Sequence, residues 1–168
     1  MKRTLVVALF LFLVAMPVSV MAGKKPGPVD IKNMSKVFIG WVDVDPGDYH
    51  KQGYSTQQDY ANVISGANTN FQKTCSSKAF SGKTVTGAQA RGDEKTAGND
   101  LYVKFSDVRY DHKYRLHIAV HLIDLKTNAE IGSIPLKTHG AHFCTLSTCL
   151  DKELDEVSKE VENMVGGK

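Results

Sequence analysis

Apolar and polar residues alternate over three successive segments between Leu101 and Leu136, and this alternation constrains the fold more than any other feature of the chain. A period of two is typical of strands that bury one face and expose the other. Turn-forming residues separate the segments at Asp111–His112 and at Lys126–Asn128. The stretch therefore predicts an antiparallel meander whose buried face carries Leu101, Val103, Phe105, Leu116, Ile118, Val120, Leu122, Ile134 and Leu136.

The first turn sets the register between the first two strands of the meander. A two-residue turn at Asp111–His112 predicts that Phe105 lies opposite Ile118. A slip of one residue would turn core side chains toward solvent, so the two faces are strongly specified.

The second turn sets the register of the third strand. A three-residue loop at Lys126–Asn128, with Asn128 in the left-handed region, places Val120 opposite Ile134. Pro135 then lies on the outer face of the third strand. Because proline has no backbone N–H to donate to a neighbouring strand, its presence indicates an edge strand.

The remaining segments complete the domain. Residues 36–44 are apolar on both faces, as in a central strand, and residues 83–88 form a short strand. Residues 55–75 carry apolar side chains at helical spacing, and so do residues 150–164, for which Ser147 or Thr148 is the expected N-cap. We therefore predict an α+β fold, in which an antiparallel-rich sheet of about five strands packs two amphipathic helices on one face.

The meander also predicts the outer face of the sheet. Tyr102, Lys104, His117 and His121 alternate away from the core and form a candidate ligand-binding face. The two histidines would share a metal ion only with a third ligand, and the expected register places no carboxylate to supply one. A solvated strand face with ordinary histidines is the alternative interpretation.

The stretch THGAHFCTLSTCL (138–150) contains His139, His142, Cys144 and Cys149. Two nitrogen and two sulfur ligands suit zinc, although the spacings differ from those of common zinc fingers. Cys149 in the first turn of the last helix, with His142 as base, would alternatively form a reactive thiol pair. The stretch connects the last strand to the last helix, which favours a disulfide over either site.

Three pairings of Cys75, Cys144 and Cys149 are open. A Cys144–Cys149 bridge would close a small loop. A bridge from Cys75 to either partner would enclose about seventy residues and stabilise the fold by about 4 kcal/mol in the chain-entropy model. An odd number of cysteines leaves one thiol free.

Residues 1–22 have the pattern of a secretory signal, with Lys2 and Arg3 before an apolar run and a small-residue cleavage site at Ala22. Removing 22 of the 168 residues leaves 146, which suits one domain over 36–168 after a flexible tether at 23–35. Of 21 basic residues 19 then remain against 18 acidic ones, which argues against nucleic acid or an anionic membrane surface as the partner. The apolar run of the signal is too short for a membrane span, so no stable membrane insertion is expected after signal cleavage. Export makes a disulfide favourable.

Two further motifs have plain structural interpretations. The tripeptide Arg91–Asp93 is more typical of a solvated turn than of an adhesion site. Trp41, the single tryptophan, is expected in the core of its strand.

The segment from Asn99 to Pro135 resembles the strand meander of bacterial envelope proteins related to the amino-terminal domain of TolB and to the curli-secretion lipoproteins. Residues 99–103 match the strand entry of those proteins, and residues 123–128 match their turn before the next strand, with Asn128 where they usually have glycine. The resemblance implies no catalytic residues. It implies instead an exported accessory domain of the cell envelope that needs no cofactor and binds another envelope or secreted protein. The alternative is a small thiol- or zinc-dependent enzyme that uses His139, His142, Cys144 and Cys149.

Overall fold

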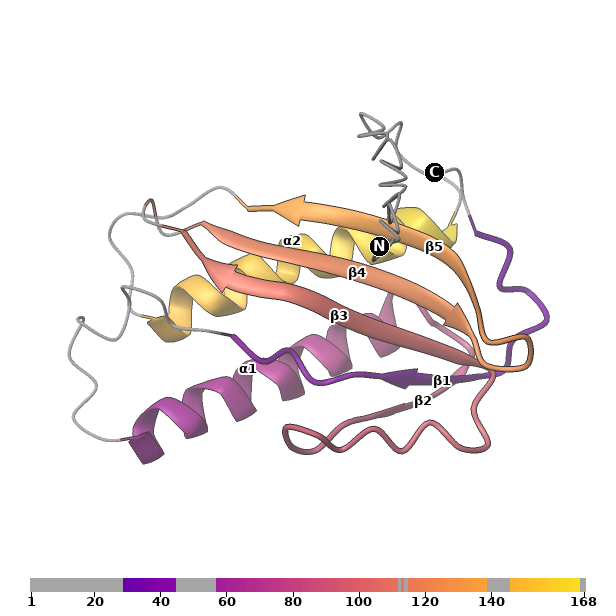
Figure 1. Cartoon of the computed structure of the whole chain (residues 1–168), viewed down its shortest axis with the longest axis horizontal. Helices are drawn as coiled ribbons and strands as arrows, with labels where there is room; N and C mark the ends of the chain where they lie inside the picture. Colours follow the sequence, from indigo (N-terminus) through magenta and orange to yellow (C-terminus); the bar gives the residue numbers. More distant parts are fainter. Residues whose placement is uncertain (1–28, 45–56, 112, 114, 139–145, 167–168) are drawn as a thin grey trace, which may run out of the picture.

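The structure of the protein is a computed structural model, and it describes residues 29–44, 57–111, 113, 115–138 and 146–166. In chain order the elements are β1 (Lys36–Ile39), α1 (Gln57–Ser77), β2 (Thr84–Gly87), β3 (Leu101–Tyr110), β4 (Leu116–Asp124), β5 (Ala129–Lys137) and α2 (Leu146–Gly166) (Figure 1). This is the element order that the sequence predicts.

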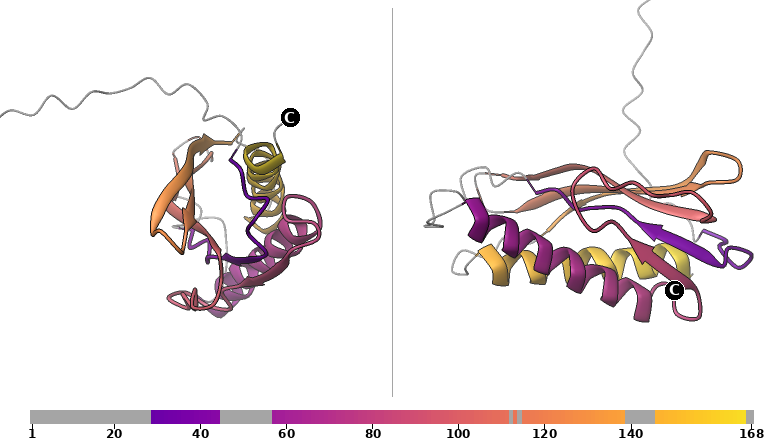
Figure 2. Two further views of the ribbon diagram at one scale, coloured as in Figure 1. Left: turned by 90° about the vertical axis from the view of Figure 1, so that its right-hand side faces the viewer. Right: turned by 90° about the horizontal axis from the view of Figure 1, so that it is seen from below.

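The five strands form one mixed sheet in the order β2-β1-β3-β4-β5. β1 is parallel to both β2 and β3, because α1 carries the chain back along the sheet before β2 begins. β4 is antiparallel to both of its neighbours, β3 and β5. Both helices cover the same face of the sheet (Figure 2), so the predicted α+β class and its one-sided layering are confirmed.

The core lies between the helices and the sheet. Its fully buried side chains include Val37 and Ile39 of β1, most of the predicted apolar face of the meander, and one side of α2, where Leu150, Leu154, Val157 and Val161 are at most 2% exposed. α2 begins at Leu146, earlier than expected, so Ser147 and Thr148 lie inside its first turn and neither is its N-cap.

The register of the first hairpin differs from the prediction by two residues. Phe105 pairs with Val120 instead of Ile118. The connection is longer than two residues, because the Asp111 N–H bonds to the Arg115 carbonyl and closes a wider loop. A bulge then places two β3 residues opposite one residue of β4, with Asp107 at a φ of 52°. A shift of two leaves the predicted core residues Leu101, Val103 and Phe105 on the core face, whereas beyond the bulge Tyr110 also turns into the core.

The second hairpin has the predicted register away from its turn, but nearer the turn a register shift between Leu122 and Ile123 pairs Asp124 with Ala129, so the predicted three-residue loop is not formed. Val120 pairs with Ile134, and Asn128 has a φ of 55° in the left-handed region. β5 is an edge strand of the sheet, and Pro135 is exposed on it.

β1 is shorter than the predicted strand 36–44. Its ladder ends at Ile39, although the Gly40 N–H still bonds to the Val103 carbonyl of β3 at 2.9 Å, and the chain then continues over α1 (Figure 1). α1 spans Gln57–Ser77, close to the predicted 55–75. Residues 29–35 belong to the folded domain rather than to a free tether, since Ile31 is 5% exposed and the Val29 N–H bonds to the Met164 carbonyl at 2.7 Å.

Candidate functional site

The outer face of the sheet is the side that neither helix covers (Figure 2). Lys104 of β3 lies directly opposite His121 of β4, and Lys137 of β5 lies directly opposite His117. Three of the four predicted ligand-face residues, Lys104, His117 and His121, are therefore brought together here. Both lysines are exposed, and within the described part of the chain neither has an ionic partner.

His117 is held by the first hairpin loop. Its Nε2 lies 3.1 Å from the Asp111 Oδ2, which also accepts from the Arg115 guanidinium at 2.7 Å. Burial opposes ionisation of Asp111, but hydrogen bonds from Arg115, from His117 and from backbone N–H groups hold the pKa of Asp111 well below its usual range. The carboxylate is therefore charged at all ordinary pH values and orients the imidazole.

His121 is held from both sides. Its Nε2 lies 2.7 Å from the Ser106 hydroxyl, and its Nδ1 lies 2.9 Å from Glu130 Oε2 and 3.2 Å from the Ser133 hydroxyl. The expected register placed no carboxylate as a third ligand beside the two histidines, whereas the two hairpins bring Asp111 to His117 and Glu130 to His121. Each imidazole has its own carboxylate, and no group of three metal-ligating side chains occurs among the described residues.

Tyr102 does not belong to the open face. It is 7% exposed, because it packs with Phe38 and Ala88 in a second small apolar cluster on this side of the sheet. Burial, reinforced by the Glu94 carboxylate, raises the pKa of Tyr102 to about 12. The sequence placed its side chain on the correct face but did not show that the loop after β2 covers that end of the sheet.

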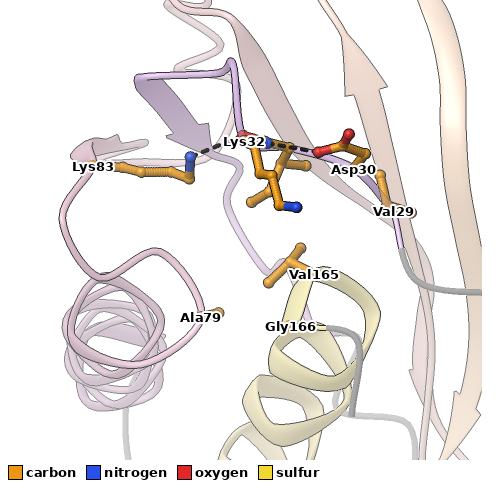
Figure 3. Close-up of a pocket in the computed structure, with 8 residues that line it drawn as sticks. Val29, Asp30, Lys32, Ala79, Lys83, Val165 and Gly166 are labelled. Atoms are coloured by element: carbon orange, nitrogen blue, oxygen red, sulfur yellow. Dashed lines mark hydrogen bonds between the residues drawn. The ribbon is translucent and has the colours of Figure 1, made fainter.

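A cavity of about 460 Å³ lies between the N-terminal segment and the ends of the two helices (Figure 3). Its lining includes Asp30, Lys32, Lys83 and Val165. The Lys83 ammonium donates to the carbonyls of Ile31, at 2.9 Å, and Met34. This lysine therefore fastens the N-terminal segment to the domain, which is a structural role.

The cysteines and the 138–150 stretch are described only in part. Cys75 is fully buried with a free thiol, and burial raises its pKa to about 12. The structure therefore contains neither of the two bridges from Cys75. His139, His142 and Cys144 lie outside the described residues, as does the side chain of Cys149. The Cys144–Cys149 bridge, the zinc site and the thiol pair remain predictions.

No protein-family model and no curated protein matches this chain. Among solved structures, a PelC dodecamer from Paraburkholderia phytofirmans is 17% identical at a TM-score of 0.49, covering 81% of this chain and 92% of that one. A PelC variant from the same organism has a TM-score of 0.48 at 16% identity, covering 82% and 95%. A neuraminyllactose-binding hemagglutinin homologue from Helicobacter pylori has a TM-score of 0.40 at 10% identity, covering 84% and 89%.

None of these three is a TolB domain or a curli-secretion lipoprotein, so that resemblance stays a prediction. The three likenesses are distant, and no property of those proteins is transferred to this chain. Within the described residues, no helix combines the length and apolar character that a membrane span requires.

Proposed function

We propose that this protein is an exported, non-catalytic accessory domain of the bacterial cell envelope, which binds an acidic surface of another envelope protein through its open sheet face. The observation that carries the proposal is the position of Lys104 and Lys137. Both are exposed and have no ionic partner within the described part of the chain, and they lie opposite His121 and His117 in the sheet.

The other charged groups of this face support a binding role. Asp111 and Glu130 are occupied by the two histidines, and Asp107 is paired with Arg109 at 3.0 Å. Lys104 and Lys137 are the ammonium groups of this face that have no ionic partner within the described part of the chain, and complementary charge steers association and sets orientation. The signal-like residues 1–22 support export.

The face is also built to stay rigid. The hydrogen bonds of His117 and His121 join β4 to the first hairpin loop and to β3 and β5, so the surface is ordered before binding. A preordered surface loses less conformational entropy on association.

Site-specific photocrosslinking tests the proposal. A photoreactive amino acid is introduced at Lys104 or Lys137 in the exporting cell, with Lys152 on α2 as the matched exposed control. We expect one discrete heavier species from each sheet position and none from the control. A heavier species from Lys152 alone would contradict the use of the sheet face, and turnover of a substrate by the purified monomer would contradict the accessory role.

A further inference from the structure

A groove lies where the β1–β2 ladder stops. β2 ends at Gly87, and the Ala88 N–H makes the last backbone bond of the ladder, to the Ile39 carbonyl at 2.9 Å. The Ala88 carbonyl would continue the ladder, but the Gln72 side-chain amide of α1 donates to it at 2.9 Å. α1 therefore ends the pairing of the two strands.

Gly87 permits this termination. A Cβ at Gly87 would lie 2.3 Å from the Gln72 side chain, so the amide approaches Ala88 only because residue 87 has no side chain. The chain then turns away from the sheet, and Arg91 pairs with Asp43 at 2.7 Å across the gap.

The segment after β1 is nevertheless held in an extended form. The buried Asn68 amide accepts from the Val42 N–H at 2.7 Å and donates to the Val42 carbonyl at 3.0 Å, as a neighbouring strand would. The Tyr60 hydroxyl donates to the Val44 carbonyl. Alternate residues of an extended chain direct their backbone groups to opposite sides, so Trp41 and Asp43 direct theirs away from Asn68.

The backbone groups of Trp41 and Asp43 have no hydrogen-bond partner in the described part of the chain. Both residues line a groove of about 420 Å³, together with Gln58 and Asn62 of α1 and with Gln89 and Arg91 beyond β2. Trp41 is half-buried here instead of being part of the closed core that the sequence predicts. An unpaired strand edge beside a groove is the geometry that an extended peptide completes.

We propose that this groove binds an extended peptide segment of a partner protein, which pairs with the backbone at Trp41 and Asp43 where β2 leaves the sheet. The amide side chains of Gln58, Asn62 and Gln89 supply donors and acceptors to the second edge of the peptide, and Trp41 supplies an apolar contact. The site is separate from the open sheet face, so it does not depend on the binding role proposed for Lys104 and Lys137.

Amide hydrogen exchange of the free protein is the first test. We expect the Trp41 and Asp43 N–H groups to exchange at least about tenfold faster than the Val42 N–H, since only the latter is hydrogen-bonded. Protection of all three in the free protein would overturn the proposal, because the edge would already be covered.

The second test uses random linear peptides displayed on phage and selected against the full mature chain. We expect a selected peptide to change the fluorescence of Trp41, to protect the Trp41 and Asp43 amides, and to lose affinity by about tenfold or more when alternate residues are N-methylated. Failure to select a peptide would overturn the proposal. So would protection confined to the outer sheet face, or a response only to the neutral sugars maltohexaose and chitohexaose.

Paired variants locate the binding. Ala61→Arg fills the groove from α1, whereas Gly66→Arg adds the same side chain at an exposed position of the same helix where a Cβ meets no atom within 4 Å. We expect A61R to lower peptide affinity by about tenfold or more and G66R to leave it unchanged. Equal effects of the two variants would contradict the location.

Discussion

Tyr110, the last residue of β3, donates its hydroxyl proton to the carboxylate of Glu153 on α2, and this buried bond joins the meander to the helix layer. Glu153 is 2% exposed, and its Oε1 has no hydrogen-bond partner within the described part of the chain. Burial raises the pKa of Glu153 to about 7, and the nearby charges of Glu156 and Asp111 act in the same direction, while hydrogen bonds from Tyr110 and Thr138 oppose them.

The raised pKa of Glu153 predicts that the protein loses stability as the pH rises toward neutrality. The folded protein keeps the Glu153 proton up to about pH 7, whereas the unfolded chain releases it near the ordinary value of 4.5. The Glu153 proton contributes roughly 3 kcal/mol to the free energy of unfolding. This contribution is complete below pH 4.5 and is lost by about pH 7. Urea unfolding between pH 4.5 and 8 measures the slope.

Glu153→Gln isolates this contribution, because glutamine stays neutral and still accepts from Tyr110. We expect the variant to gain stability relative to the unmodified protein as the pH rises from 4.5 to 8. Glu160→Gln makes the same change elsewhere on the same helix and serves as the matched control. Parallel curves for E153Q and the unmodified protein would mean that Glu153 does not titrate as described.

Asn68→Ala is expected to destabilise the fold by about 2 to 4 kcal/mol, because it leaves the buried N–H and carbonyl of Val42 without partners. Thr69→Ala on the same helix removes an exposed hydroxyl that bonds only to the Ser65 carbonyl, and it should change stability by less than about 0.5 kcal/mol. Chemical unfolding of both variants gives the difference. Equal effects would show that Asn68 does not hold the segment after β1.

At the turn residue Asn128, one substitution is expected to cause no loss of stability. Its φ of 55° is open to glycine without strain, so Asn128→Gly should be neutral or slightly stabilising. Asn128→Ala should cost about 1 kcal/mol, because alanine is disfavoured in the left-handed region. Thermal unfolding compares the two, and a loss of stability with glycine equal to that with alanine would contradict the assigned turn.

Burial makes the Cys75 thiol unreactive in the folded protein, since its pKa is raised to about 12. Without reductant, we expect a thiol reagent to label Cys75 after unfolding and not before. A peptide map of the same sample reports on the bridge predicted between Cys144 and Cys149. Labelling of Cys75 in the folded protein would contradict its burial.

The sequence predicted what depends on local periodicity and turn chemistry. The alternation through β3, β4 and β5 was sufficient to assign the faces of the meander up to the bulge in β3, and Asn128 was sufficient to place the second hairpin in register away from its turn. The first hairpin was misregistered, because Asp107 carries no sequence signal for a bulge and the Asp111 carboxylate closes a wider loop by contacts formed only after folding.

The candidate sites were less accessible to sequence reasoning for a physical reason. Tyr102 and Lys104 are two residues apart in β3, so the alternation places both on the outer face. Only the packing of the loop after β2 buries Tyr102 and leaves Lys104 exposed. The end of the β1–β2 ladder depends on Gln72 meeting Gly87 from another element. Contacts of this kind depend on tertiary structure, which a local pattern does not contain.

The affinity of the partner recovered by crosslinking, measured for two doubly charge-reversed variants, tests the binding role of the open sheet face most directly. K104E/K137E reverses two charges on the sheet face, and K73E/K152E makes the same change at exposed positions on the helices. We predict that K104E/K137E lowers the affinity by about tenfold or more and that K73E/K152E does not. Equal affinities for both variants, or a loss confined to K73E/K152E, would contradict the binding role of the open sheet face.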